Sequence, residues 1–272
     1  MPRAALRVGG LSIGRQQLGL ALALECERVV CIAGAVTPSI IELQHVAEAA
    51  GARFHVIANA RALVGLVTAG DELIALGDGL FTSLHIARDL LGQGQAVLVQ
   101  PIEQGLAAGF ERIDINHASA AALRIPGRLV EQLGDMPPDC DALSTLQRIA
   151  LQAGVRQRGI PPLADGKLFW ALVRNEEDAH ALEPQWIRQR TSDAGPLSPA
   201  RMIARLAVRG FGPALLHSGS GARVVAAAAA VSVLIGLVAG WFDLVVTGLM
   251  ICVLGWVLRE AAALLARIEE EH

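Results

Sequence analysis

The chain contains 272 residues, 53% of them hydrophobic, and its 23 basic residues against 26 acidic ones leave a formal net charge of -3 at pH 7. No stretch combines a basic face with interleaved aromatic residues, so a nucleic acid is not expected as a partner. The cysteines, Cys26, Cys31, Cys140 and Cys252, are scattered and form no CxxC pair, which argues against a disulfide framework and a thiolate metal site. We expect them to be reduced, inert thiols.

Short apolar runs alternate with amphipathic segments along residues 1–185. The expected strands are 28–33, 54–58, 72–76, 96–100, 111–115 and 168–173. The expected helices are 13–24, 38–50, 60–67 and 82–91. This alternation is typical of an α/β domain with a Rossmann-like, mostly parallel sheet and helices on both faces. Continuous apolar strands agree with burial on both faces. We therefore predict one such domain over residues 1–185.

Residues 186–222 are rich in proline, glycine and serine, which predicts a linker that contains one amphipathic helix. Arg201, Arg205 and Arg209 recur at every fourth position and would share one face of that helix. We expect this face to contact anionic lipid headgroups. The alternative is an ordinary charged face in water.

Two nearly uncharged runs, residues 224–242 and 244–258, follow the linker and are separated by Asp243. A membrane-crossing helix needs about 20 apolar residues, so the segment 223–272 predicts a transmembrane helical hairpin with a short tail. Arginines flank the hairpin on both sides, which places both flanks and the first domain in the cytoplasm of an inner-membrane protein. Residues 1–36 show no export signal. Gly236 and Gly240 have GxxxG spacing, which indicates helix packing or merely a Gly/Ala-rich segment.

The strand expected at 72–76 runs into Gly77, Asp78 and Gly79. In open parallel sheets ligands bind beyond the carboxyl ends of strands, and glycines let the backbone approach a ligand closely. Gly77, Asp78 and Gly79 are therefore candidate ligand-binding residues, with Asp78 as a candidate Mg²⁺ ligand. The alternative is an aspartate that serves only the turn.

Three segments in order resemble the nucleotidyltransferase family, the pyrophosphorylases with a glycosyltransferase-A-like fold that make nucleotide sugars and CDP-alcohols. They are the Gly77-Asp78-Gly79 strand end, residues 7–13 with 26–32, and residues 170–179. The resemblance implies that Asp78 holds a divalent cation on nucleotide phosphates. It also places Gly9 and Gly10 in a ligand-binding segment.

The sequence departs from that family at three points. Only six residues precede Arg7, where the family has a phosphate-binding strand and loop. The single lysine, Lys167, lies in the wrong segment to act as the family's loop lysine. The family's second metal-binding aspartate falls near Leu172, which cannot bind a metal. Electrostatic stabilisation by fixed cations and metal ions supplies most of phosphoryl-transfer catalysis. We therefore expect a catalytically inactive protein of this type.

Its expected role is binding or regulation in lipid head-group or envelope-glycan synthesis, because some bacterial enzymes join a cytidylyltransferase domain to a membrane CDP-alcohol phosphatidyltransferase. The expected partners are the membrane, a nucleotide or nucleotide sugar, and a membrane enzyme or a second copy. One alternative is an active nucleotidyltransferase or glycosyltransferase with an atypical Mg²⁺ site. Another is a structural membrane adaptor without a ligand.

Other polar residues have simpler interpretations. The simplest interpretation of the polar cluster Asp114, Asn116 and His117 is a helix N-cap, and the alternative is a contact with a ligand. His45, His55, His85 and His180 lack metal-ligand spacing. Residues 10–14 match GxSxG, but a nucleophile elbow needs a full strand ahead of it, so Ser12 is not expected to be a hydrolase nucleophile.

Overall fold

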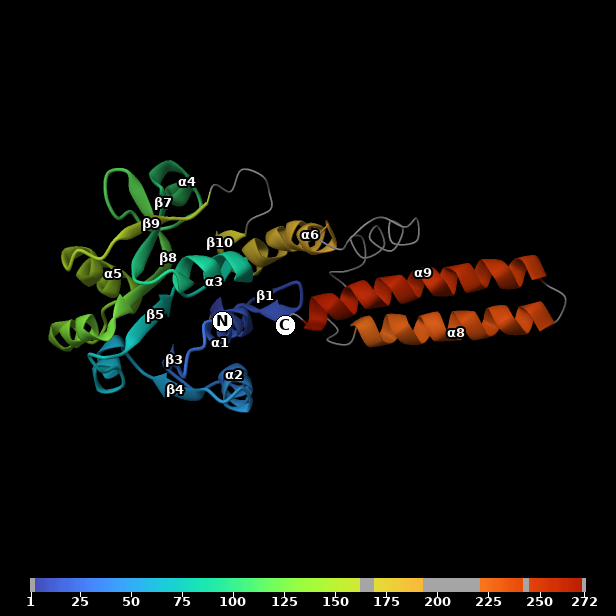
Figure 1. Cartoon of the computed structure of the whole chain (residues 1–272), viewed down its shortest axis with the longest axis horizontal. Coiled ribbons are helices and arrows are strands. Elements are labelled where there is room, and N and C mark those ends of the chain that lie inside the picture. Colours follow the sequence, from blue (N-terminus) through green and yellow to red (C-terminus); the bar gives the residue numbers. More distant parts are fainter. Residues whose placement is uncertain (1–2, 162–168, 193–220, 242–244, 271–272) are drawn as a thin grey trace. The chain divides into compact units, whose positions relative to one another are not determined.

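A computed structural model describes residues 3–161, 169–192, 221–241 and 245–270 (Figure 1). The chain divides into two compact units: the first comprises residues 1–6 and 12–174, and the second comprises residues 7–11 and 175–272. The basic helix face predicted at Arg201, Arg205 and Arg209 lies outside the described residues, as does Lys167.

The first unit contains most of the short elements. Its 3-10 helices are η1 (Arg3–Ala5), η2 (Ala60–Gly65) and η3 (Gly127–Asp135). Its α-helices are α1 (Ile13–Ala23), α2 (Pro38–Ala49), α3 (Leu84–Gly92), α4 (Ile102–Ala107) and α5 (Ala142–Gln152). Its strands are β3 (Arg28–Ile32), β4 (Arg53–Ile57), β5 (Glu72–Leu76), β6 (Leu80–Thr82), β7 (Ala96–Pro101), β8 (His117–Pro126), β9 (Gln157–Gly159) and β10 (Trp170–Leu172). Strand β1 (Arg7–Val8) pairs with β2 (Leu11–Ser12).

The largest sheet has four strands in the order β5-β8-β7-β9. Strand β8 is antiparallel to both β5 and β7, and only β7 and β9 are parallel. Of the two-stranded sheets, β3 and β4 are parallel whereas β6 and β10 are antiparallel. The prediction of a mostly parallel, glycosyltransferase-A-like sheet is therefore wrong. The reason is β8, which follows the short helix α4 and returns between β5 and β7, a path that needs no long crossover.

Helices cover both faces of the four-stranded sheet, as the alternation of elements predicted. Along β7, Leu98 packs with residues of α3 such as Leu91 on one face. Its neighbours Val97 and Val99 face the opposite side, where Ile149 of α5 packs. This period of two residues buries β7 on both sides. The core of the first unit is therefore centred on β7 and β8.

The second unit contains β1, α6 (Glu176–Ser192), α8 (Gly221–Trp241) and α9 (Val245–Glu270). Helices α8 and α9 form an antiparallel pair (Figure 1). Gly255 allows the close approach, because a Cβ there would lie 2.7 Å from the Val233 side chain. Large side chains on the pair remain exposed, among them Leu234, Leu249 and Met250.

The predicted transmembrane hairpin is wrong: no helix in the described part of the chain is long and apolar enough to cross a membrane. The uncharged part of α8, residues 224–241, extends about 27 Å at about 1.5 Å per residue, against a hydrocarbon core of about 30 Å. Helix α9 reaches Arg259 after an even shorter run. The inner-membrane location was predicted from this hairpin, so that prediction is wrong for the same reason. Gly236 and Gly240 lie within α8, but their surroundings are outside the described part.

Candidate functional site

The carboxyl end of β5 turns sharply through Gly77, Asp78 and Gly79, which we call the β5 tip. The Gly77 amide donates to the Ala121 carbonyl of β8 at 2.8 Å. Gly79 has a φ of +82°, and a Cβ on it would lie 2.3 Å from the Val173 carbonyl oxygen. Gly79 is therefore required by close backbone packing, and a Cβ on Gly77 would lie 2.9 Å from the Ala121 Cβ, so both glycines have a structural role whether or not a ligand binds.

The conformation of β8 behind the tip is unusual. Ala121 has a positive φ of 55°, a value that is rare for residues with a side chain. Its amide donates to the buried Ser119 hydroxyl at 2.9 Å, and that hydroxyl donates to Gln147 Oε1 of α5 at 2.7 Å. Buried polar groups of this kind are retained when they are satisfied by hydrogen bonds. The network fixes the Ala121 carbonyl that holds Gly77.

Asp78 presents an exposed carboxylate at the tip, with 65% of its side chain accessible. The Arg3 guanidinium Nε lies 4.0 Å from Asp78 Oδ2. The pKa of Asp78 is raised from its ordinary value, mainly because neighbouring protein displaces water from the carboxylate; Arg3 opposes the shift and Asp141 adds to it. Perturbed pKa values cluster at functional sites, which makes Asp78 a candidate.

Two further groups lie within electrostatic range of Asp78. The pKa of the Cys31 thiol, near the end of β3, is raised chiefly by burial and also by Asp78. Asp141 caps α5, since its Oδ1 accepts from the Ser144 amide at 2.7 Å. The Ser144 hydroxyl also lies 2.8 Å from Glu111 Oε2. The end of β3 and the start of α5 thus each place one titratable group within electrostatic range of Asp78.

This arrangement bears on the Mg²⁺ site predicted at Asp78. Within residues 3–161, 169–192, 221–241 and 245–270, no group of three or more histidine, cysteine, aspartate or glutamate side chains is placed to hold a metal ion. Mg²⁺ in proteins often relies on one or two carboxylates together with substrate phosphates. Asp78 and Asp141 are the carboxylates that could contribute, and the Mg²⁺ site stays a prediction.

Gly9 and Gly10 lie in the turn between β1 and β2, both at positive φ. The Gly9 amide donates to Oε1 of the buried Glu183 at 3.1 Å, and a Cβ on Gly9 would lie 2.3 Å from the Trp186 ring. These contacts of α6 account for the glycine locally. Gly9 belongs to the second unit and Asp78 to the first, so the structure does not bring the two predicted glycine segments into one defined site.

The helix N-cap predicted at Asp114, Asn116 and His117 is wrong, because strand β8 begins at His117. Asp114 Oδ1 instead accepts from the backbone amides of Asn116 and His117, each at 2.8 Å. The Asn116 amide is the largest of the causes that lower the pKa of Asp114 to about 2, followed by the His117 side chain. The cluster forms a turn that leads into a strand.

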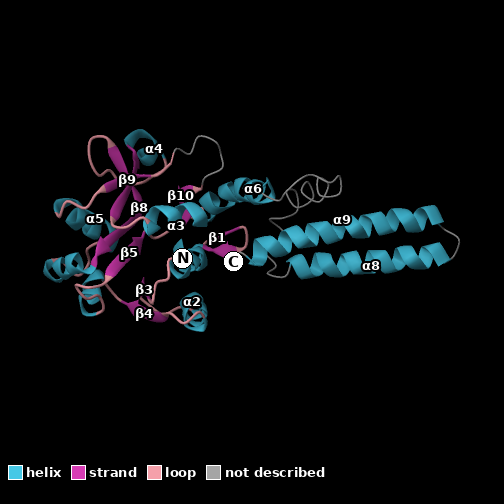
Figure 2. Cartoon of the chain, in the orientation of Figure 1, coloured by secondary structure: helices cyan, strands magenta, loops and turns pink. Residues whose placement is uncertain are grey.

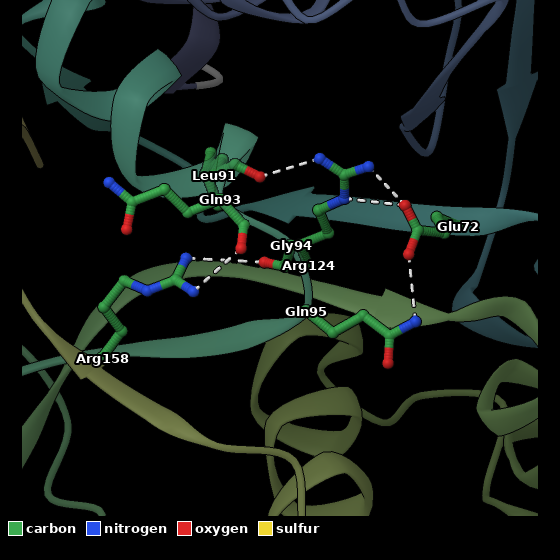
Figure 3. Close-up of polar contacts among 7 residues, drawn as sticks. All are labelled: Glu72, Leu91, Gln93, Gly94, Gln95, Arg124 and Arg158. Carbon is green, nitrogen blue, oxygen red and sulfur yellow. Dashed lines mark hydrogen bonds and ion pairs between the residues drawn. The ribbon is translucent and has the colours of Figure 1, made fainter.

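Two arginines at the carboxyl end of α3 were not anticipated from the sequence (Figure 3). Arg124 Nη1 donates to the Leu91 carbonyl at 2.9 Å, and its Nε donates to Glu72 Oε2, also at 2.9 Å. Arg158 donates to the carbonyls of Leu90 and Gln93. Helix α3 has no basic residue in its own last turn, so cations from β8 and β9 satisfy its terminal carbonyls. The pair has a structural role.

Comparison with known proteins adds no relative: no family model and no curated protein matches this chain.

Proposed function

We propose that the chain is a binding or regulatory protein whose first unit holds a phosphate-bearing ligand, such as a nucleotide or nucleotide sugar, at the β5 tip without transferring the phosphate. One observation carries the proposal: Arg3 and Asp78 place opposite charges 4.0 Å apart at the carboxyl end of β5, with 42% and 65% of their side chains exposed. The guanidinium suits a phosphate, and the carboxylate suits a hydroxyl of the ligand.

The electrostatics of the β5 tip favour binding over catalysis. Phosphoryl transfer depends on several fixed positive charges around the reacting phosphate. Arg3 lies against Asp78, which partly compensates its charge, and Asp141 adds a second negative charge nearby. Such a site supports a modest affinity for a ligand more readily than a highly charged transition state. The protein would then act as a partner in lipid head-group or envelope-glycan synthesis.

The same two carboxylates support a second candidate, an active nucleotidyltransferase with an atypical Mg²⁺ site. Asp141 helps to raise the pKa of Asp78, which means that the two negative charges repel each other. A divalent cation between them would relieve that repulsion. This candidate predicts that nucleotide binding depends on Mg²⁺.

The experiment that separates these functions is a thermal-unfolding titration of the full chain with nucleoside triphosphates and nucleotide sugars, with and without Mg²⁺. A ligand present at one hundred times its Kd stabilises the folded state by about 2.7 kcal/mol. Arg3→Gln and Asp78→Asn should remove the ligand-induced shift. The exposed residues Arg128 and Asp139 provide matched controls as Arg128→Gln and Asp139→Asn.

Each outcome decides between the candidates. A shift without Mg²⁺ that depends on Arg3 and Asp78 supports the binding protein. A shift that requires Mg²⁺ and is accompanied by pyrophosphate release from the triphosphate supports the enzyme. If none of the ligands shifts the melting temperature, or if Arg3→Gln leaves the shift unchanged, the β5 tip is not the ligand site.

A further inference from the structure

A glutamine of α1, Gln17, reaches across to the β5 tip. Its side-chain amide Nε2 donates to the Gly77 carbonyl at 2.8 Å and to the Leu80 carbonyl at 3.0 Å. Gly77 directly precedes Asp78, and Leu80 is the first residue after the tip. One side-chain amide therefore connects the two ends of the turn that presents the Asp78 carboxylate.

The backbone of this turn depends on that side-chain amide. The Leu80 amide donates to the Gly77 carbonyl at 3.1 Å, which closes the turn from within. Leu80 is almost fully buried, and a buried carbonyl that lacks a donor is costly. Gln17 supplies the donor at Leu80 and a second donor at Gly77. The position of the tip is thus fixed in part by a side chain of α1.

The neighbouring Gln16 makes a different contact. Its side-chain amide donates to the Thr82 carbonyl, and its Oε1 accepts from the Thr82 amide at 3.5 Å. Thr82 is the last residue of β6, which pairs with β10. Gln16 therefore holds the end of β6 rather than the turn at the tip. The two adjacent glutamines make similar hydrogen bonds, so Gln16 is a matched comparison for Gln17.

Helix α1, one of the cyan helices in Figure 2, also packs against the segment that carries Arg3. The Ile13 amide at its start donates to the Leu6 carbonyl at 2.9 Å, just after η1. A Cβ on Gly14 would lie 3.1 Å from the Ala4 carbonyl oxygen, so the helix and η1 are in close contact. The same helix therefore holds both charged groups of the proposed ligand site.

We propose that Gln17 is a positioning residue that makes the β5 tip selective for phosphate ligands that also carry hydroxyl groups, such as those of a nucleotide ribose. It does so by holding Asp78 at a distance of 4.0 Å from Arg3. This inference rests on the proposed function, in which Arg3 binds the phosphate and Asp78 binds a hydroxyl. Gln17 acts through Asp78 and does not touch the ligand.

Losing the Gln17 amide should affect one part of the ligand and not the other. The carbonyls of Gly77 and Leu80 would lose their common donor, so the turn between them would be free to shift. A hydrogen bond from a ligand hydroxyl to Asp78 would then weaken, because its length and angle must stay within a narrow range. Arg3 belongs to η1, so its contact with a phosphate would be retained.

The test compares two probes on the full chain by isothermal titration calorimetry without Mg²⁺. Cytidine triphosphate has phosphates and hydroxyls, whereas inorganic triphosphate has phosphates alone. We expect Gln17→Met to weaken the binding of cytidine triphosphate by about tenfold or more, as for the loss of a hydrogen bond to a charged group. It should leave the affinity for inorganic triphosphate unchanged. The control Gln16→Met should change neither affinity, although both variants should lower the melting temperature.

A double-mutant cycle tests whether Gln17 acts through Asp78. In a chain that already carries Asp78→Asn, Gln17→Met should cause no further loss of affinity for cytidine triphosphate. An equal loss with and without Asp78 would overturn the proposal. Equal weakening of the two probes by Gln17→Met would overturn it as well, and so would equal effects of Gln16→Met and Gln17→Met.

A measurement without ligand separates the failure of this inference from the failure of the proposed function. The pKa of Asp78 is followed by NMR in the free chain, where Arg3, Asp141 and Cys31 are the groups within electrostatic range. Gln17→Met should move this pKa toward its ordinary value, because a looser turn readmits water to the carboxylate. Gln16→Met should leave the pKa unchanged.

The two failures then have different signatures. If the parent chain binds neither probe, the proposed function fails, and the role of Gln17 is decided by the pKa of Asp78 alone. An Asp78 pKa that is the same in Gln17→Met and in the parent chain would overturn the positioning role. If Gln17→Met does not fold, Gln17→Asn takes its place, because its amide is one methylene too short to bridge the two carbonyls.

Discussion

The Arg28 guanidinium lies 2.6 Å from the Asp71 carboxylate and so connects β3 with the segment ahead of β5. In the described part of the chain, β3 and β5 share no backbone pairing. About 30% of each side chain is accessible, which leaves the pair open to screening by salt. Asp71 also accepts from the Thr68 amide and hydroxyl, and these bonds, together with Arg28, lower its pKa.

Replacing Arg28 should therefore loosen the starts of β3 and β5 together. We expect Arg28→Met to lower the melting temperature and to speed amide exchange at both strand starts. The decrease in melting temperature caused by Arg28→Met should be smaller at 1 M salt, because the Debye length there is only about 3 Å. An effect confined to β3 would contradict the assignment of Arg28 as the connection between them.

The β5 tip should tolerate no side chain at Gly79. Gly79→Ala must adopt a positive φ and also meet the Val173 carbonyl at 2.3 Å. The backbone conformation alone costs about 1–3 kcal/mol. Gly94 offers a matched control, since its φ is +97° but a Cβ there meets nothing within 4 Å. In urea unfolding, Gly79→Ala should be clearly more destabilising than Gly94→Ala; equal losses would mean that the Val173 contact is unimportant.

Asp114 should stabilise the chain at neutral pH and lose that effect in acid. Its pKa is lowered to about 2, so its contribution is complete above the unfolded pKa of about 3.9 and disappears as the pH falls toward 2. Melting temperatures of the parent chain and of Asp114→Asn, measured from pH 6 to pH 2, should converge across this window. A constant difference at every pH would show that the charge of Asp114 makes no contribution.

Asp78 should have the opposite pH dependence. Because its pKa is raised, its contribution to stability is present below the unfolded pKa and is lost as the pH rises through the folded value. The ionised form therefore opposes folding at pH 7. Asp78→Asn should raise the melting temperature at pH 7 and have little effect near pH 3, whereas Asp139→Asn should change neither. A destabilised Asp78→Asn at pH 7 would contradict this sign.

The carboxyl end of α3 should depend on arginines from other strands. Arg124→Met removes the donor to the Leu91 carbonyl and breaks the contact with Glu72. The expected loss is about 1 kcal/mol, because the side chains are partly solvated. Exchange at residues 90–94 should increase, and the exposed Arg128→Met serves as the control. Unchanged exchange in that segment would exclude a capping role for Arg124.

Several elements could be predicted from local pattern alone. Strand β5 occupies 72–76 as expected, and β3, β4 and β7 differ from their predicted bounds by about one residue. These strands are short apolar runs bounded by polar or glycine-containing segments, so their neighbours in sequence define them. Helices α1, α2 and α3 were likewise predicted from their amphipathic segments.

Strand β8 could not be predicted in this way. Residues 118–122 are mostly alanine, which favours helix over strand as an intrinsic preference. Only pairing on both sides, with β5 and with β7, makes this segment a strand. The strand expected at 111–115 was wrong for a related reason, because that stretch contains a turn held by Asp114. Contacts such as Arg3 with Asp78 join residues far apart in sequence and leave no local pattern.

The Ser119 hydroxyl donates to Gln147 and accepts from the Ala121 amide, and these two hydrogen bonds have a consequence for any ligand of the first unit. Gln147 is 93% inaccessible and cannot touch a ligand at Asp78. It nevertheless holds the hydroxyl that orients Ala121, whose carbonyl anchors Gly77. A change as small as glutamine to leucine in the interior of α5 would thus reposition the backbone that carries Asp78. The backbone position of the residue ahead of Asp78 therefore depends in part on an amide side chain in the core.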